Sequence, residues 1–333
     1  MKAFEDMSAS IKECVGDEPV LLLISGGVDS TVTAAVLLKS LKPEQVHLMY
    51  MDTGLMRKNE TVFVRGALEK LGAKNIHIVM CESEFLSALK GITEPEEKRR
   101  VIGDMFITIQ EREVSKLGLP ETYFLAQGTL LIDLVESGAA GSGSGGGGGS
   151  GGSQASVIKS HHNVASPLVA AKRAAGKIVE PLAAFTKEQG RELGRFLGVD
   201  DEIIRRHPFP GPGIGVRILG EITKEKCDIL RDADAIFIEE LKRRNLYDAI
   251  WQAAAILLPI RSVGLTCDDP PQRRYGWVLA LRAVIGDGAT ALPYPFEIKD
   301  ILEISERITR EVKDIGRVTY DISAKPPATI EWE

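Results

Sequence analysis

A short segment between an apolar run and a helical pattern has the residue types of a phosphate-binding loop. The segment is Ser25-Gly26-Gly27-Val28-Asp29-Ser30-Thr31, and it follows the apolar run from Val20 to Ile24. Glycines let a backbone approach an anion closely, and a helix that begins there presents free N–H groups and the positive end of its dipole. The hydroxyl groups of Ser25, Ser30 and Thr31 add further donors. The segment therefore predicts a site for phosphate groups.

Two features of this segment limit the interpretation. It has no Gly-Lys-[Ser/Thr] sequence, so it differs from the phosphate loop of kinases and GTPases. The alternative is an ordinary turn from strand to helix, in which Asp29 or Ser30 simply caps the helix. We favour the phosphate loop because the residues between strand and helix match it along the whole segment.

Two further groups of polar residues follow later in the chain. Asp133 and Glu136 are three residues apart, which places them on one face of a helix, either as functional acids or as solvated ones. Lys159, His161 and His162 lie on a polar segment, where a lysine could neutralise phosphate charge as a point cation. The adjacent histidines have no cysteine or third histidine at ligand spacing, so a zinc site is not expected.

Alternating apolar and helical patterns predict the elements that position these residues. Four short apolar runs have the character of buried strands: Val20 to Ile24, Val46 to Met51, Asn75 to Met80 and Tyr123 to Ala126. Helical patterns lie between them, at 29–41 and 62–71. This order predicts an α/β fold with a doubly wound parallel sheet. Ligands of such sheets bind beyond the carboxyl ends of the strands, where SGGVDS, DTG and AQGT lie.

Two interruptions divide the chain. Ten of the 33 glycines lie between Gly138 and Gly152, and the Gly/Ser insertion at 138–153 is expected to be flexible coil. Three prolines between Arg206 and Gly213 exclude regular helix and predict a rigid junction. The predicted domains are therefore residues 1–205 and 206–333. The second is expected to be a smaller α+β domain, with a helix at 228–244 and strands at 253–262, 277–285 and 317–322.

The composition excludes several classes of protein. The 333 residues carry 41 basic and 47 acidic side chains, a net charge of −6, which disfavours nonspecific binding to nucleic acids or membrane surfaces. The four cysteines lie far apart without a CxxC pair and predict free thiols. No apolar segment resembles a signal peptide or approaches the roughly 20 residues of a membrane span. Together these features predict a cytoplasmic protein.

Several motifs carry a resemblance to a known family. SGGVDS resembles the PP-loop of the ATP pyrophosphatases, which cleave ATP between its α and β phosphates and adenylate an oxygen of a second substrate. The rest of the chain is similar to the synthetase part of the GMP synthase family. The segments that carry this similarity are EEKRRVIGDMF, FLAQGT, IKSHHNV, RHPFPGPGIGVRILGE, DADAIFIEEL and KPPATIEWE. The resemblance implies that residues 206–333 form a homodimer and complete the site for xanthosine monophosphate (XMP).

The resemblance also implies roles for individual residues. The loop that would bind the ATP phosphates comprises Ser25, Gly26, Gly27, Val28, Asp29, Ser30 and Thr31. Asp29 would also help to hold Mg²⁺, and Asp133 and Glu136 would form a catalytic acidic pair near the adenylate. Lys159 would act on the reaction from a lid, beside His161 and His162. The residues implied in binding XMP are Arg99, Asp268, Arg273, Lys325 and Glu331.

The family's reaction sets the expected function. The 2-oxygen of XMP attacks the α-phosphorus of ATP, pyrophosphate leaves, and ammonia displaces AMP to give GMP. The loop begins at residue 25, which leaves no room before it for a glutaminase domain, so ammonia is expected from a separate glutamine amidotransferase subunit or from solution. Two alternatives stay open: a PP-loop ligase that forms an amide or amine on another nucleotide-like substrate, and a non-catalytic paralogue that binds nucleotide.

Overall fold

The structure is a computed structural model of the chain, and it describes residues 2–130, 167–265, 270, 272–286 and 288–333. No helix within these ranges is long and apolar enough to cross a membrane. Three of the four cysteines, Cys14, Cys81 and Cys227, lie in these ranges, and all three are free thiols as predicted.

The chain forms two compact units, each of which combines segments distant in the sequence. Unit 1 comprises Met1–Met51, Thr61–Val79 and Ile109–Arg206. Unit 2 comprises Asp52–Glu60, Met80–Thr108 and His207–Glu333.

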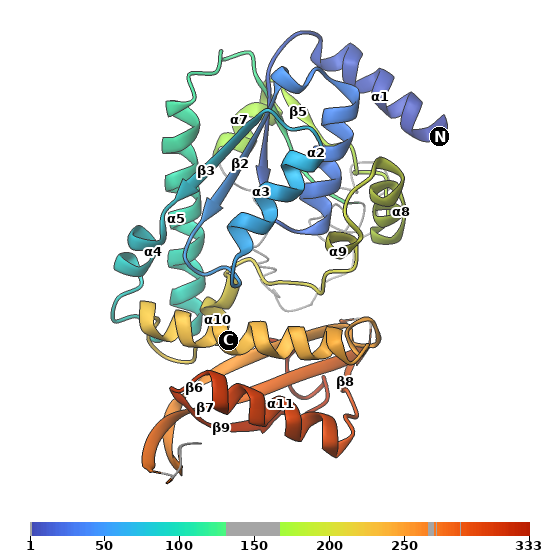
Figure 1. Cartoon of the computed structure of the whole chain (residues 1–333). Helices are drawn as coiled ribbons and strands as arrows, with labels where there is room; N and C mark the ends of the chain where they lie inside the picture. Colours follow the sequence, from blue (N-terminus) through green and yellow to red (C-terminus); the bar gives the residue numbers. More distant parts are fainter. Residues whose placement is uncertain (1, 131–166, 266–269, 271, 287) are drawn as a thin grey trace, which may run out of the picture. The chain divides into compact units, whose positions relative to one another are not determined.

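Unit 1 is built on a five-stranded sheet (Figure 1). Its strands are β1 (Val20–Ile24), β2 (Val46–Asp52), β3 (Asn75–Met80), β4 (Phe124–Ala126) and β5 (Ile178–Val179). They lie in the order β3-β2-β1-β4-β5, and β1 pairs in parallel with both β2 and β4. The chain therefore winds outward from β1 in one direction and then in the other, which confirms the predicted doubly wound sheet. The point where the direction changes lies between β1 and β4.

Helices connect and cover these strands. They are α1 (Lys2–Val15), α2 (Val28–Ser40), α3 (Glu60–Lys70), α5 (Pro95–Lys116), α7 (Pro167–Ala174), α8 (Lys187–Leu197) and α9 (Asp201–Ile204), with a short 3₁₀ turn η1 at Pro43–Gln45. The first part of α5, up to Thr108, belongs to unit 2. The helix α2 is buried along most of its length and packs against α8. Gly194 of α8 has no side chain, which allows Val32 of α2 to approach closely. This packing holds the start of α2 at the end of β1.

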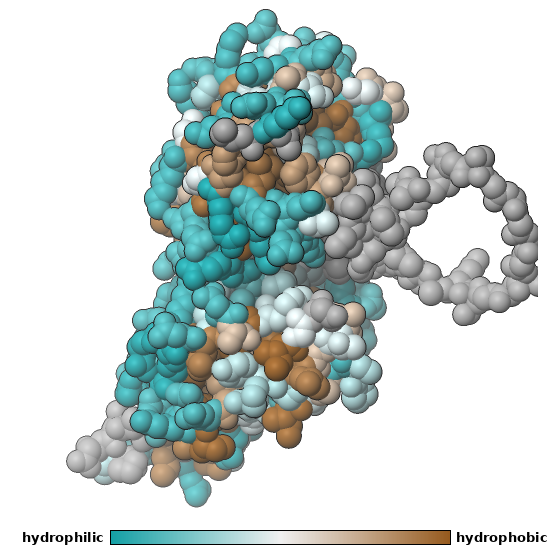
Figure 2. All heavy atoms as spheres, turned by 90° about the vertical axis from the view of Figure 1, so that its right-hand side faces the viewer, coloured by the Kyte–Doolittle hydropathy of each residue, from teal (hydrophilic) through white to brown (hydrophobic). Residues whose placement is uncertain are grey.

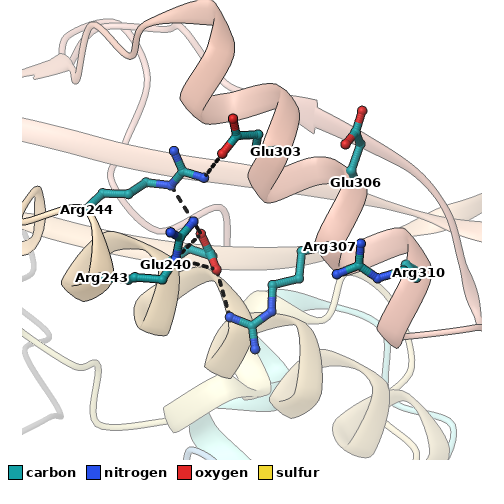
Figure 3. A pocket seen from close by; sticks show the side chains of 7 residues that line it. All are labelled: Glu240, Arg243, Arg244, Glu303, Glu306, Arg307 and Arg310. Atoms are coloured by element: carbon teal, nitrogen blue, oxygen red, sulfur yellow. Dashed lines mark hydrogen bonds and ion pairs between the residues drawn. The ribbon is translucent and has the colours of Figure 1, made fainter.

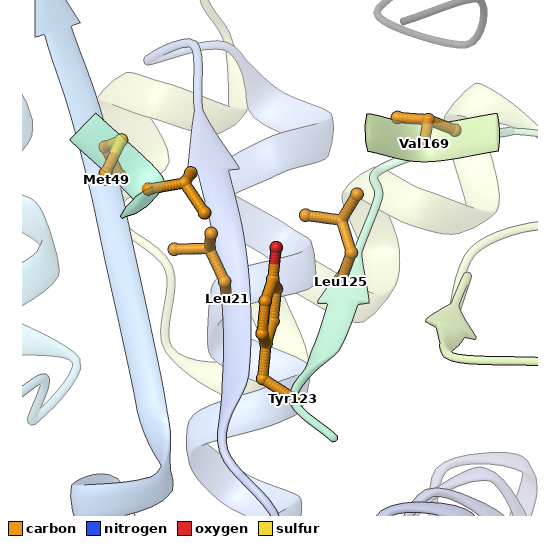
Figure 4. Close-up of a cluster of buried hydrophobic side chains, with 6 residues drawn as sticks. Leu21, Met49, Tyr123, Leu125 and Val169 are labelled. Atoms are coloured by element: carbon orange, nitrogen blue, oxygen red, sulfur yellow. The ribbon is translucent and has the colours of Figure 1, made fainter. Parts of the chain in front are cut away.

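A hydrophobic cluster fixes one face of the sheet (Figure 4). Leu21, Met49 and Leu125 come from three neighbouring strands, where alternate side chains point to the same face. Tyr123 lies in the cluster, and Val114 of α5 and Val169 of α7 cover it. Leu21 and Leu125 are 0% exposed, and full burial of such a side chain stabilises the fold by about 1.5–3 kcal/mol.

Unit 2 contains the second sheet. Its strands are β6 (Gln252–Leu265), β7 (Arg273–Gly286), β8 (Ala291–Pro293) and β9 (Ile315–Tyr320). The central strand β7 pairs antiparallel with β6 and β8 and parallel with β9. The helices of this unit are α4 (Glu82–Ala88), α10 (Lys224–Arg243) and α11 (Ile298–Glu311), with 3₁₀ turns η3 (Gly213–Arg217) and η4 (Tyr247–Ala249). The predicted helix and three strands are all present.

The strands β6 and β7 extend beyond their predicted limits. The extra residues include Val263, Leu265 and Tyr275, whose side chains are 42–69% exposed. Backbone pairing continues there without a core to bury the side chains, with Leu265 opposite Arg273. A sequence pattern that depends on burial therefore ends before the strands do.

Candidate active site

The backbone turns sharply between β1 and α2. Gly26 has φ +80°, a left-handed conformation that glycine adopts without steric cost. Gly27 is the N-cap of α2, and as a glycine it offers no side chain to cap this helix end. The first N–H groups of any α-helix lack a carbonyl partner within the helix. The turn thus places the positive end of a 13-residue helix at the carboxyl end of β1.

The loop carbonyls are bound by groups of the protein. The Gly27 carbonyl accepts hydrogen bonds from the Thr31 hydroxyl at 2.8 Å and from the Ser30 hydroxyl at 3.2 Å. The Gly26 carbonyl accepts one from the Arg206 guanidinium at 2.9 Å. Because these oxygens are engaged, they do not compete with an incoming anion for the N–H groups.

The structure gives the predicted hydroxyl donors different roles. Thr31 is 2% exposed and Ser30 is 8% exposed, and both reach back to Gly27 as hydroxyls in a first helical turn often do. Ser25 is exposed, and its hydroxyl lies 3.1 Å from that of Ser30. Ser25 is thus the hydroxyl at the mouth of the loop, whereas Ser30 and Thr31 shape it.

A second loop lies directly against the first. It follows β4, and a Cβ atom added at Gly128 would lie 3.1 Å from the carbonyl carbon of Asp29 and 3.2 Å from the Ser30 nitrogen. The neighbouring Thr129 hydroxyl donates to Glu180 at 2.8 Å. The two loops therefore meet backbone to backbone at the point where the sheet changes direction, which is where ligands of doubly wound sheets bind.

This contact gives a testable prediction for Gly128→Ala. The added methyl group must displace the backbone of Asp29, so we expect stability to fall by about 1–3 kcal/mol and ATP to bind more weakly. Thermal unfolding and calorimetric titration with ATP measure the two effects. Gly66→Ala is the matched control, because nothing lies within 4 Å of its added Cβ. Equal ATP affinity in both variants would contradict the prediction.

Magnesium is the metal that the resemblance implies. In the ranges that the structure describes, no group of three or more His, Cys, Asp or Glu residues could hold a metal ion. Mg²⁺ at nucleotide sites is usually held by one or two carboxylates together with substrate phosphates and water. Asp29 is the acidic residue of the first turn of α2 and is half-buried. One carboxylate beside a phosphate loop fits an ion that binds together with the nucleotide.

Unit 2 has a pocket of about 480 Å³ between the start of α5 and the C-terminal segment. It contains two of the predicted substrate residues, Arg99 and Glu331. Arg99 is about one-quarter exposed and pairs with Glu96. The remaining lining residues are Glu94, Pro95, Glu96, Thr329, Trp332 and Glu333.

Buried charges hold the C-terminal segment in place. Arg217 is fully buried and donates to both carboxylate oxygens of Glu331, at 3.0 and 2.8 Å. Burial disfavours the charged guanidinium, yet the carboxylates of Glu331 and Asp234 raise the pKa of Arg217. The Gln252 amide donates to the same Glu331 oxygen as one arm of Arg217. Glu331 is therefore fixed in orientation at the wall of the pocket.

The last residue is held in a similar way. Lys98 is 0% exposed, and its ammonium group donates to the Ile218 carbonyl at 2.8 Å and pairs with the Glu333 side chain. Burial lowers the pKa of Lys98, and the pairing with Glu333 opposes that shift. The Trp332 indole donates to Asp321 at 3.0 Å. The C-terminal segment is therefore docked within unit 2.

The other predicted residues lie apart from this pocket or outside the described residues. Lys325 donates to the Gly288 carbonyl at 2.6 Å. Arg273 is exposed at the start of β7. The predicted residues that fall outside the described ranges are Asp133, Glu136, Lys159, His161, His162 and Asp268.

Sequence reasoning gave no role to Lys98, Arg206, Arg217 or Gln252. Three of them stand in the quoted motifs, and Arg217 interrupts the apolar run GIGVRIL. A charge within an apolar run must find a buried partner, and this signal could have marked Arg217. Gln252 carries no comparable signal, because it precedes an ordinary strand pattern.

A second pocket in unit 2, of about 240 Å³, lies between α10 and α11 (Figure 3). Its lining is charged: Glu240, Arg243, Arg244, Glu303, Glu306, Arg307 and Arg310. Hydrogen bonds from Arg243, with further help from Arg307 and Arg244, lower the pKa of Glu240 to about 2. Arg244 also pairs with Glu303, so the central charges are mutually satisfied. The residues that line this pocket therefore form an ion-pair network that joins α10 and α11.

Two family models match the chain. The model described as GMP synthase C terminal domain matches residues 239–332. The model described as Asparagine synthase matches residues 5–109, which contain the phosphate loop and strands β1 to β3. The first match covers the second sheet and most of the docked C-terminal segment.

Curated relatives match almost the whole chain. A glutamine-hydrolyzing GMP synthase of Thermotoga petrophila is 45% identical over 332 residues, which are 99% of this chain and 62% of the relative. The one of Zymomonas mobilis is 47% identical over 327 residues, 98% of this chain and 58% of the relative. The chain thus spans about three-fifths of the length of these relatives. With the C-terminal domain of that family at residues 239–332 and this identity along almost its whole length, the chain belongs to the GMP synthase family.

Proposed function

We propose that the chain catalyses the ATP-dependent amination of XMP to GMP through an adenylyl-XMP intermediate, with release of AMP and pyrophosphate. The observation that carries this proposal is the N-terminus of α2 at the end of β1, which Gly27 leaves without a side-chain cap and beside which the loop carbonyls are bound by other groups of the protein. It supports the binding of a polyphosphate at the switch point of the sheet. The identity to GMP synthases supports the choice of substrates.

The proposed chemistry begins at the phosphate loop. The 2-oxygen of XMP forms a bond to the α-phosphorus as the bond to pyrophosphate breaks, so negative charge grows on the leaving group. The N–H groups at the start of α2 would stabilise that charge without reorganisation. Mg²⁺, when bound, would neutralise part of it, and Asp29 is the residue that would hold the ion. Asp133, Glu136 and Lys159 are proposed as further catalytic residues on the resemblance alone.

We further propose that XMP binds through the pocket that Arg99 and Glu331 line. A guanidinium suits a nucleotide phosphate, and a carboxylate accepts hydrogen bonds from purine N–H groups. Arg217 and Gln252 occupy both acceptor sites of Glu331 Oε1 but only one of Oε2. Among the residues that the structure describes, one acceptor site of Glu331 therefore has no donor and suits a ligand. The further residues proposed on the resemblance are His161, His162, Asp268, Arg273 and Lys325.

The proposed organisation has residues 1–205 as the ATP-pyrophosphatase domain and 206–333 as the XMP-binding and dimerisation domain. Apolar patches interrupt the hydrophilic surface (Figure 2). In unit 2, Ile260, Leu265 and Tyr275 on β6 and β7 are 55–69% exposed. Exposed apolar surface of this kind supports a homodimer. Ammonia would come from a separate glutaminase subunit or from free ammonium.

The test is an amination assay with ATP, Mg²⁺, ammonium and XMP. We expect GMP, AMP and pyrophosphate in equal amounts, and Asp29→Ala is expected to lower kcat/KM on the order of 100-fold. Asp17→Ala is the matched control, because Asp17 is 91% exposed and pairs only at the surface with Lys42. Absence of both AMP and GMP with the unaltered chain would reject XMP as the substrate.

A further inference from the structure

Arg206 connects the start of the proline-rich segment to the phosphate loop, although the two are 180 residues apart in the sequence. Its side chain is half-buried, and its Nη1 donates to the Gly26 carbonyl at 2.9 Å. The guanidinium also lies over the ring of Phe63, 5.1 Å from the centroid. Both contacts lie within unit 1. A planar cation held on an aromatic face has little freedom to leave the carbonyl.

The peptide between Gly26 and Gly27 is held at both of its polar groups. Its carbonyl accepts from Arg206, and its N–H donates to the Ser25 hydroxyl at 3.3 Å. Glycine stands on both sides of this peptide, so the backbone alone does not fix its orientation. A rotated peptide would turn a carbonyl oxygen toward the anion site and repel phosphate. The contacts of this peptide therefore decide whether the loop attracts an anion.

We propose that Arg206 is a positioning residue that keeps the Gly26 carbonyl turned away from the ATP phosphates, so that the loop presents N–H groups to them. This inference rests on the proposed function only in that ATP occupies the loop. It assigns Arg206 a role in the affinity for polyphosphate, separate from the binding of XMP. Phe63 contributes by holding the guanidinium in place.

The test compares Arg206→Gln, Arg206→Lys and the control Arg205→Gln. Arg205 is the neighbouring arginine, and its side chain is 52% exposed and pairs with Asp201 at the surface. Calorimetric titrations with ATP and with pyrophosphate, both with Mg²⁺, report on the loop without any need for turnover. We expect Arg206→Gln to weaken both ligands by about tenfold, the size of one hydrogen bond to a charged group. Arg206→Lys should restore part of the affinity, because lysine keeps a cationic donor.

Two further measurements separate positioning from general loss of structure. The melting temperature of Arg206→Gln should match that of Arg205→Gln, and KM for XMP should stay unchanged while KM for ATP rises. The proposal is wrong if Arg206→Gln binds ATP and pyrophosphate as tightly as Arg205→Gln does. It is also wrong if the unaltered chain does not bind ATP. If the unaltered chain binds ATP but makes no GMP, the choice of XMP fails while the titrations still test Arg206.

Discussion

Replacement of Arg217 by methionine is expected to lower the free energy of unfolding by about 3–5 kcal/mol, because it removes the fully buried cation that binds the Glu331 carboxylate. Arg217 is 0% exposed and binds Glu331 through two hydrogen bonds, and Asp234, 3.9 Å away, is 3% exposed. Methionine fills much of the volume but offers no charge. Chemical denaturation followed by tryptophan fluorescence measures the loss, since Trp332 belongs to the segment that Glu331 anchors.

Two comparisons make this result specific. Arg310→Met removes an arginine that is 61% exposed and pairs at the surface with Glu311, and should cost at most about 1 kcal/mol. The double variant Arg217→Met with Glu331→Gln should recover part of the stability, because the partly buried negative charge is removed together with its partner. A loss in Arg217→Met no greater than that in Arg310→Met would show that the pair does not anchor the segment.

His207 is expected to make unit 2 sensitive to acid. Its Nδ1 accepts from the Ala253 N–H at 3.2 Å, and its Nε2 therefore donates to the Tyr247 carbonyl at 2.9 Å. The ring stacks on that of Tyr247, with centroids 3.8 Å apart. A second proton would have to sit on Nδ1, where it would face another N–H group. Burial, the largest cause, lowers the pKa of His207 to about 4.

The direction of the pH dependence follows from this shift. The unfolded chain, in which the pKa of histidine is about 6.5, binds the proton more readily than the folded chain does. The contribution of His207 is therefore fully present above pH 6.5 and is lost as the pH falls through 4. The loss amounts to about 3 kcal/mol at the acidic end of that range.

Denaturation curves at several pH values between 7.5 and 4 measure this effect. The His207→Asn variant should be less stable at pH 7.5 but should lose less stability on acidification than the unaltered chain. The effect of His207 is the difference between the stability losses of the two chains, because burial also lowers the pKa values of the half-buried His47 and His77, which are present in both. Parallel pH profiles for the two chains would exclude His207 as the source of acid sensitivity.

The sequence predicted those parts of the fold that depend on neighbouring residues. Val20–Ile24 became a strand with the predicted limits, because a central parallel strand is apolar along its whole length. Asn75–Met80 also kept its predicted limits, although it is an edge strand whose residues are only partly buried or exposed. The short strands β5 and β8, of two and three residues, were not predicted. No local feature of the sequence predicts that residues 52–60 and 80–108 belong to unit 2 either.

The candidate site also has parts that the sequence predicted and parts that it did not. The phosphate loop is a single stretch of chain, so its glycines and its helix start could be read directly from the sequence. The contacts that complete the loop in unit 1 and the pocket in unit 2 are distant in the sequence: Arg206 donates to Gly26 across 180 residues, and Arg217 donates to Glu331 across 114. Such pairs depend on how the sheets and turns bring the chain together, and a local pattern contains no information about that.

The docked C-terminal segment has a consequence for the order in which the chain matures during synthesis. Unit 1 has all its residues once Arg206 has been made, whereas Lys98 waits for a partner that is translated 235 residues later. At about 5–20 residues per second, a ribosome takes on the order of 10 s to make the last stretch, His207–Glu333. During that interval the start of α5 carries a lysine without its counter-charge. The nascent chain is therefore expected to resist proteases first in unit 1, and in unit 2 only after Glu333 has been made.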